Sequence, residues 1–169
     1  MDLIIIVSYG IVSLLSGCLL SSLISDIKFI INDWNWVATV SDDKLIQEIV
    51  LFSNDILHQN RIKHFPSVEI SYYKHPSHLG AFCDPTIVIY PKNNPTIRIL
   101  VNTTLHEVNH YIQSKTNLKE FKKYDEYIKR TGYDKNPLEI QCRIFAKKWT
   151  APCISHLKSK GIIKRAWLA

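Results

Sequence analysis

Apolar and polar positions recur along this chain with two different periods, which predicts both helices and strands. Residues 42–59 follow a helical period, because their apolar side chains are spaced by three and four positions. Ser41 precedes this run, and Asp42 and Asp43 are acidic residues of the kind favoured in the first turn of a helix. The pattern therefore predicts one amphipathic helix over residues 42–59.

Residues prone to form strands predict a small sheet in the next part of the chain. Residues 68–73 read Val-Glu-Ile-Ser-Tyr-Tyr and alternate as a strand does. Two short apolar runs follow at residues 80–82 and 86–90, separated by Asp84 and Pro85, which are typical turn residues. We expect an antiparallel hairpin here. A strand of this hairpin beside a functional helix would offer its edge to an extended peptide.

A longer helix is predicted after the hairpin. Asn94 followed by Pro95 is a typical helix start, and apolar residues keep a helical period from there to Ile112. Residues 97–101, Ile-Arg-Ile-Leu-Val, are also compatible with a strand. Residues 115–135 are polar and charged, which predicts an exposed loop or a short helix.

The same start signal occurs once more near the carboxyl end. Asn136 and Pro137 precede a helix predicted over residues 138–149, and Pro152 is expected to end it. Residues 153–160 are then expected to form a last short helix. Together these elements predict an α+β domain over residues 26–169, with a small antiparallel sheet packed on two main helices, preceded by an apolar amino-terminal segment at residues 1–25.

The amino-terminal segment changes the expected location of the protein. Residues 3–24 carry no charged side chain and are long enough to span a bilayer as a helix. We favour an uncleaved membrane anchor with the domain in the cytosol, because Lys28 follows the segment and only Asp2 precedes it. Two alternatives are a lipoprotein signal ending at Cys18 and an apolar helix packed on the domain of a cytoplasmic protein.

Charge is distributed unevenly along the chain. The net charge is +6, but residues 1–114 carry −3 and residues 115–169 carry +9. A basic half of this kind allows a nucleic-acid partner, although neither a glycine-rich phosphate loop nor an aromatic RNA-binding signature accompanies it. The four cysteines include no CxxC pair, which favours reduced thiols over a disulfide framework.

The candidate chemistry lies in the helix predicted to end near Ile112. His106 and His110 are separated by one helical turn, so their side chains project from the same face and suit two positions of a tetrahedral zinc site. Glu107 lies beside them and is placed to accept a proton from a zinc-activated water. Two histidines on an exposed helix are the plainer alternative. Against it, apolar neighbours at helical spacing place the helix in a core: Leu105, Val108 and Ile112.

A catalytic zinc site needs a third protein ligand. Glu139 is the best candidate, since it lies in the first turn of a helix with an apolar stripe, where a carboxylate needs a partner such as a metal ion. The other downstream candidates are Glu120, Asp125, Glu126 and His156.

Two motifs resemble those of a known group of peptidases. The run HEVNHYIQ, followed by Asn-Pro-Leu-Glu-Ile-Gln-Cys-Arg, is similar to the signature of small gluzincin-type zinc metallopeptidases of bacterial and phage type, including ImmA/IrrE-like proteins. The resemblance covers about residues 66–150 and implies a minimal zincin-like fold with Glu139 as third ligand, Cys142 occupying a small-residue position. SprT-like peptidases share the first motif but use a histidine as third ligand, and His156 would then have to serve.

The resemblance implies a zinc-dependent metallopeptidase, a hydrolase with Glu107 as general base and His106, His110 and Glu139 as metal ligands. Such enzymes often add a side chain that stabilises the oxyanion, and the candidates here are His78, Tyr133 and Arg143. Two other functions stay open: a non-catalytic zinc-containing binding module, and a nucleic-acid-associated protein that uses the basic carboxyl-terminal half.

Overall fold

The computed structural model describes residues 36–166. The apolar segment at residues 3–24 lies outside this range, and so does the membrane anchor predicted there. No helix in the described part of the chain is long and apolar enough to cross a membrane.

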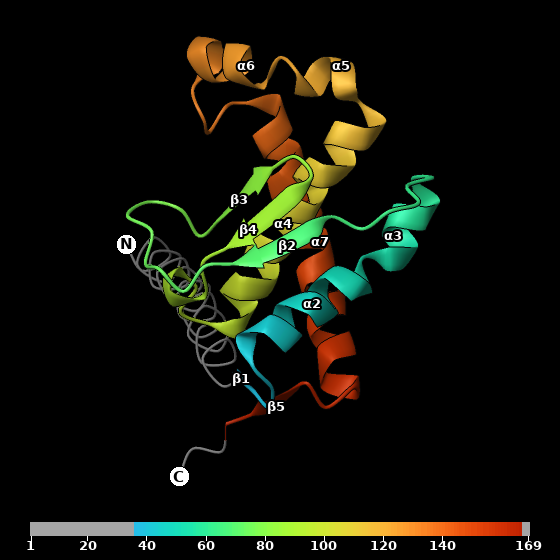
Figure 1. The fold of residues 1–169 in the computed structure, drawn as a ribbon, viewed down its shortest axis with the longest axis vertical. Helices are drawn as coiled ribbons and strands as arrows, with labels where there is room; N and C mark the ends of the chain where they lie inside the picture. Colours follow the sequence, from blue (N-terminus) through green and yellow to red (C-terminus); the bar gives the residue numbers. More distant parts are fainter. Residues whose placement is uncertain (1–35, 167–169) are drawn as a thin grey trace, which may run out of the picture. The chain divides into compact units, whose positions relative to one another are not determined.

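The described chain forms an α+β fold, as predicted (Figure 1). Its elements are, in order, β1 (Trp36–Ala38), α2 (Asp42–Phe52), α3 (Asn54–Gln59), β2 (Ser67–Ile70), β3 (Gly80–Cys83), β4 (Thr86–Ile89), the 3-10 turn η1 (Pro91–Asn93), α4 (Ile97–Thr116), α5 (Leu118–Phe121), α6 (Tyr124–Thr131), α7 (Pro137–Ser159) and β5 (Ile163–Arg165).

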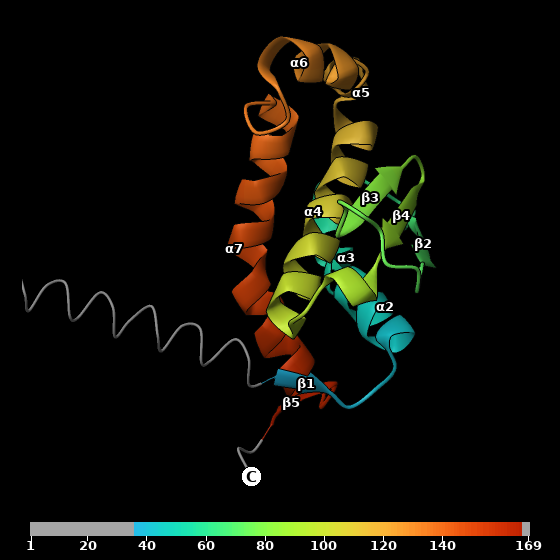
Figure 2. The same ribbon diagram turned by 90° about the vertical axis from the view of Figure 1, so that its left-hand side faces the viewer.

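Helix α4 lies between the sheet and α7 (Figure 2). Val101, Leu105 and Val108 are fully buried along it, so the apolar period read from the sequence does pack into the core. The segment at residues 97–101 is helical and not a strand. The cap is Thr96, whose hydroxyl accepts from the backbone N–H of Ile99. The predicted start at Asn94 and Pro95 is therefore two residues early.

Helix α7 begins as predicted but continues further. The Asn136 side chain accepts from the backbone N–H of Leu138, and Pro137 is the first helical residue. The prediction that Pro152 ends the helix is wrong, because α7 runs through it to Ser159. Pro152 is exposed, so the carbonyl that loses its N–H partner can be hydrated, while Cys153 and the following apolar residues stay buried on the other face. No separate helix begins at residue 153.

The helix predicted over residues 42–59 is divided at Ser53 into α2 and α3. Ser41 caps α2 as predicted, accepting from the backbone N–H of Lys44. Ser53 is fully buried and its hydroxyl donates to the carbonyl of Ile49, which offers the backbone an alternative to continuing the helix. The helical spacing of apolar residues continues across Ser53, so this spacing alone does not reveal the break between α2 and α3.

The described strands form a three-stranded sheet in the order β2-β4-β3 and a two-stranded pair of β1 with β5. The predicted hairpin is present, since β3 and β4 pair antiparallel. The three-stranded sheet is mixed and not purely antiparallel, because β2 runs parallel to β4. β3 is an edge strand of this sheet and is the strand that lies over α4 beside the candidate site.

The close approach of β3 to α4 depends on Gly80. A Cβ atom at this position would lie 2.9 Å from Thr103 Cγ2 and 3.1 Å from Glu107 Cγ. Any larger residue would have to push the strand away from the helix. Glycine therefore sets the distance between the sheet edge and the general-base candidate Glu107.

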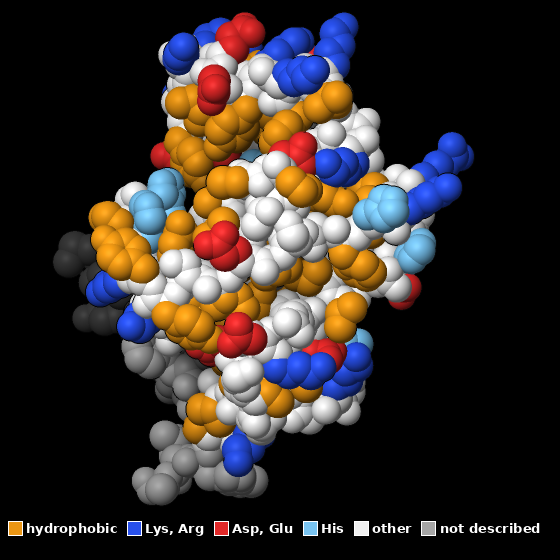
Figure 3. All heavy atoms as spheres, viewed as in Figure 1, with side chains coloured by type: hydrophobic (Ala, Val, Ile, Leu, Met, Phe, Trp, Pro, Cys, Tyr) orange, Lys and Arg blue, Asp and Glu red, His pale blue; other side chains and the backbone are white. Residues whose placement is uncertain are grey.

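Helices α5 and α6 join the neighbouring ends of α4 and α7 (Figure 1). This confirms the short helices allowed for residues 115–135, and neither helix contains a buried residue. Figure 3 shows Lys and Arg side chains at this end of the molecule together with acidic ones. Nucleic-acid binding by the basic half stays a prediction.

Candidate metal centre

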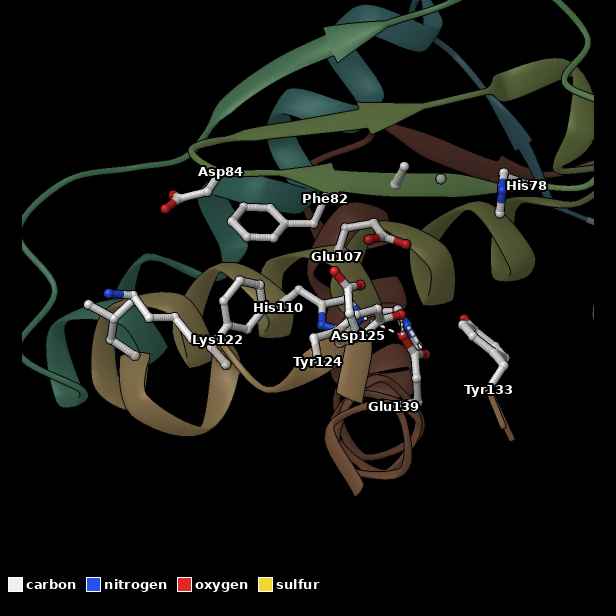
Figure 4. Close-up of a pocket in the computed structure, with 15 residues that line it drawn as sticks. His78, Phe82, Asp84, Glu107, His110, Lys122, Tyr124, Asp125, Tyr133 and Glu139 are labelled. Atoms are coloured by element: carbon white, nitrogen blue, oxygen red, sulfur yellow. Dashed lines mark hydrogen bonds and ion pairs between the residues drawn. The ribbon is translucent and has the colours of Figure 1, made fainter. Parts of the chain in front are cut away.

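The three predicted ligands, His106, His110 and Glu139, converge where α4 passes the start of α7. Figure 4 shows His110 and Glu139 at this place. The rings of His106 and His110 have centroids 4.9 Å apart. Glu139 faces both of them: its Oε2 lies 3.1 Å from His106 Nε2, and its Oε1 lies 3.1 Å from His110 Nε2. One carboxylate thus bridges the two ring nitrogens that project from the same face of α4.

The Glu139 carboxylate is incompletely satisfied in a manner that suits a cation. Its side chain is 1% exposed, and among the described residues Oε2 accepts no hydrogen bond, although His106 Nε2 lies 3.1 Å from it. The other oxygen, Oε1, accepts from the Tyr124 hydroxyl at 2.5 Å. Leaving a buried carboxylate oxygen unsatisfied is costly unless a charge compensates it. A metal ion held by Glu139 and both Nε2 atoms would supply that charge.

Gln113 orients the second histidine from behind. Its Oε1 lies 3.1 Å from His110 Nδ1, and its Nε2 donates to the carbonyl of Leu138 and to Gln141 Oε1. Because the amide nitrogen is engaged by two acceptors, the amide oxygen must face His110. When the imidazole is neutral, its hydrogen then lies on Nδ1, which leaves the Nε2 lone pair available to a metal ion. Metal-bound histidines usually have such an outer partner.

Cys142 also contacts His110, and with the two histidines it forms an alternative set of metal ligands. Its Sγ lies 3.4 Å from His110 Nδ1 and accepts from Asn109 Nδ2 at 3.2 Å. His106, His110 and Cys142 could hold a metal ion, because one ligand atom of each lies within 4.8 Å of the others. Since Cys142 faces Nδ1 and Glu139 faces Nε2, one ion bound to His110 can have either of them beside it but not both.

The two donor sets differ in access to solvent. Cys142 is fully buried and lies outside the cleft, whereas His106, His110 and Glu139 line it. Burial also raises the pKa of the Cys142 thiol, so this side chain is a neutral thiol at pH 7. The Glu139 set is therefore the one in which a metal ion would face the cleft.

Charges within the centre are strongly coupled. Burial alone would raise the pKa of the Glu139 carboxyl, but its close contacts with His106, His110 and Tyr124 outweigh burial and hold this pKa well below its usual range. Burial would lower the pKa of His110, but its contacts with Cys142 and Glu139 outweigh burial and raise the pKa to about 10. Both contacts therefore favour the protonated imidazolium form of His110. A metal ion would have to replace this proton.

Glu107 lines the cleft together with His106 and His110, and Figure 4 shows it near His110. It is 6% exposed, and burial raises the pKa of its carboxyl. A surface glutamate paired with a cation would have a lowered pKa instead. A buried carboxyl with a raised pKa, lying in a cleft, is typical of a group that exchanges protons.

The centre opens into a cleft of about 550 Å³ between β3 and the α5–α6 segment. Of the oxyanion candidates, His78 and Tyr133 line this cleft beside His106 and Glu107. Burial and the nearby Glu139 raise the pKa of Tyr133, which keeps its hydroxyl protonated. Arg143 is not in the cleft lining, and its guanidinium donates to the backbone carbonyl of Asp134.

The remaining third-ligand candidates lie elsewhere. His156 packs on Phe52, with ring centroids 5.4 Å apart. Glu120 is paired with Lys123 and accepts from the Tyr127 hydroxyl. Asp125 lines the cleft but belongs to the exposed α5–α6 segment. None of these side chains approaches both histidines as Glu139 does.

The sequence reasoning did not identify Gln113 and Tyr124 as parts of the centre. Gln113 has a usable signal, since a residue three positions after His110 lies on the same face of α4. Tyr124 has none, because its place depends on how the α5–α6 segment folds back over α7.

In comparisons with known proteins, no protein-family model, curated protein or solved structure matches this chain significantly. The similarity to gluzincin-type peptidases stays a prediction from the two motifs.

Proposed function

We propose that the protein is a zinc-dependent peptidase whose metal is held by His106, His110 and Glu139. The observation that carries this proposal is the buried Glu139 carboxylate, whose two oxygens each lie 3.1 Å from the Nε2 atom of one histidine. Two imidazoles and one carboxylate, open to a cleft on the fourth side, are a donor set typical of catalytic zinc. Zinc at such a position lowers the pKa of a bound water toward 7 and polarises a carbonyl.

Glu107 is the proposed general base and acid. Its carboxylate accepts a proton from water in the cleft and then delivers it to the amine that leaves when the peptide bond breaks. A raised carboxyl pKa strengthens Glu107 as a base, so that the group can hold the proton between the two steps. His78 and Tyr133 line the cleft, and in this proposal one of them donates a hydrogen bond to the carbonyl oxygen as it gains charge.

The proposed substrate is an extended peptide bound along β3. This strand is an edge strand of the described sheet, and Gly80, Ala81 and Phe82 line the cleft. An extended peptide can add to such an edge through backbone hydrogen bonds, largely independent of its side chains.

The test is peptide hydrolysis by the purified full-length chain loaded with zinc. A mixture of unstructured peptides should be cleaved, cleavage should stop on chelation, and zinc should restore it. Glu107→Gln should keep the zinc but lose hydrolysis by about 100- to 10,000-fold, because the amide cannot take the proton. Equal cleavage by this variant, purified in the same way, would remove Glu107 from the reaction and with it this function.

A second candidate is a closed, non-catalytic metal site with Cys142 as ligand, supported by the grouping of its thiol with the two histidines. The two candidates respond oppositely to two isosteric changes. Cys142→Ser should release the metal from the closed site and leave the catalytic site loaded. Glu139→Gln should do the reverse.

A further inference from the structure

We propose that Phe82, Phe121 and Leu118 form a binding pocket for a bulky apolar side chain of the substrate, carried by the residue that supplies the scissile carbonyl. This inference rests on the proposed peptidase function and names the class of peptide: one with Phe, Leu or Met immediately before the cleaved bond.

The pocket lies directly beside the metal ligands. Phe82 on β3 and Phe121 on α5 meet edge to face, with ring centroids 5.8 Å apart. Each of these rings lies 6.5 Å from the ring of His110, and all three line the cleft. A side chain attached next to a carbonyl at the metal centre would reach this pair of rings within one residue.

Leu118 completes the pocket and is only half covered in the free protein. It is 50% exposed although it lines the cleft, and it follows α4 at the start of α5. An exposed leucine beside a reactive centre gains from being covered by an apolar ligand group. Figure 3 shows hydrophobic side chains between the α5–α6 end and the sheet. Lys122 and Asp125 line the same cleft with opposite charges, so they favour neither sign in the substrate.

The direction of the peptide follows from the direction of β3. Gly80, at its start, lies against Glu107, while Phe82 packs near Tyr111 and Asp84, just after its end, pairs with Lys115. Antiparallel pairing is the commoner and slightly more stable arrangement for an added strand. A peptide antiparallel to β3 runs from the Asp84 end toward Gly80, and its amino-terminal part therefore passes Phe82 before the chain reaches Glu107.

The expected preference can be given a size. Because the side chain is buried on binding, a peptide with Leu or Phe at this position should be cleaved roughly 10- to 100-fold more efficiently than one with Ala. This lies within the range by which apolar pockets discriminate among substrates. The preference should fall on the residue before the cleaved bond. If the peptide bound parallel to β3, the preference would fall on the residue after the cleaved bond instead.

The first experiment is a cleavage profile of wild type and two variants on peptides that differ only at this residue. Leu118→Ala should reduce the preference for Phe over Ala by about threefold or more, and Leu118→Trp should shift it toward small side chains by filling the pocket. Leu51→Ala is the matched control, because Leu51 is 48% exposed on α2 and lies outside the cleft lining. An unchanged preference in both Leu118 variants would overturn the pocket.

The second experiment separates this inference from the proposed function, because it needs metal but no hydrolysis. Acetyl-amino-acid hydroxamates place their side chain on the amino-terminal side of a metal-binding group, and succinyl hydroxamates place it on the other side. With the zinc-loaded Glu107→Gln protein, acetyl-Phe hydroxamate should bind at least about tenfold more tightly than acetyl-Ala hydroxamate. Equal affinities, or a preference confined to the succinyl series, would overturn the pocket even where wild type cleaves peptides. Absence of hydrolysis with this preference intact would overturn only the peptidase function.

Discussion

Helix α4 buries 13 of its 20 residues, whereas neither α5 nor α6 buries any. The two regions nevertheless line the same cleft. α4 presents His106, Glu107 and His110 from a helix packed on both sides, by the sheet and by α7. The α5–α6 segment covers the cleft from an exposed connection with few packing constraints.

This difference separates two requirements of a reactive site. Metal ligands must be held to within fractions of an ångström, which needs rigid elements and packed neighbours. A substrate wall must open and adapt, and segments with few buried contacts have the low local stability that allows this. Tyr124 links the regions, since it belongs to α6 and donates to the metal-ligand candidate Glu139.

The largest effect is expected from removing a ligand of the packed region. His106→Ala or His110→Ala should weaken zinc binding by more than about 100-fold, above the effect of losing an outer partner. Glu126→Gln, on α6, should leave zinc affinity unchanged. Competition titration with a chromophoric chelator measures both. Stoichiometric tight zinc in the double histidine variant would show that the metal lies elsewhere.

Two Leu→Ala changes compare the stability of the regions directly. Leu105 on α4 is fully buried, so Leu105→Ala should lower the free energy of unfolding by about 2–5 kcal/mol. Leu118→Ala on α5 should change it by no more than about 0.5 kcal/mol, since the side chain is half exposed. Urea unfolding of the metal-free protein followed by circular dichroism gives both values. Similar losses would mean that the α5–α6 segment is part of the core.

Gln113 tests whether the packed region also orients its ligands. Gln113→Met removes the acceptor at His110 Nδ1 with little change in volume and should weaken zinc binding about 10- to 100-fold. Gln141→Met is the control, because it removes a partner of the Gln113 amide nitrogen but leaves the acceptor in place. Ring nitrogen shifts in NMR spectra would report the His110 tautomer. If the two variants lose affinity equally, Gln113 has only a structural role.

The pH dependence of zinc binding tests whether His110, in the packed region, is protonated in the metal-free protein. The pKa of His110 in the metal-free protein is raised from 6.5 to about 10, so at pH 7 zinc must displace a proton from this ring. Zinc affinity should therefore rise about tenfold per pH unit between pH 6.5 and pH 9 and level off near pH 10. Titrations at three pH values, corrected for the competing chelator, measure the slope. A zinc affinity that does not change with pH would show that His110 holds no such proton in the metal-free protein.

The smallest effect is expected from the contact between the two regions. Tyr124→Phe removes the hydrogen bond to Glu139 Oε1 and should weaken zinc binding by about 2- to 10-fold, the value of an ordinary hydrogen bond. Tyr127→Phe is a matched control, because Tyr127 donates over the same 2.5 Å to Glu120 on the outside of the segment. Equal effects of the two changes would indicate that α6 acts on the metal only through its own stability.

Local sequence was sufficient for features set within a few residues. The spacing of His106 and His110 places them on one face of any helix, and the apolar neighbours Leu105 and Val108 bury that helix whatever it packs against. Asn136 and Pro137 set the start of α7 through their own side chains, and that start carries Glu139. The α+β class and the hairpin were predictable for the same reason.

Tertiary structure decided whatever depends on a distant partner. Pro152 does not end α7, since packing of the buried face outweighs one lost hydrogen bond on the exposed face. β1 and β5 pair only because the ends of the domain meet, and short three-residue strands carry too weak a local signal to predict it. The Tyr124 contact and the Phe82–Phe121 pocket join elements that the chain brings together only when α5 and α6 fold over α7 and β3. Periodicity identifies which face of an element is buried, but the partner of that face is chosen by the packing of the whole domain.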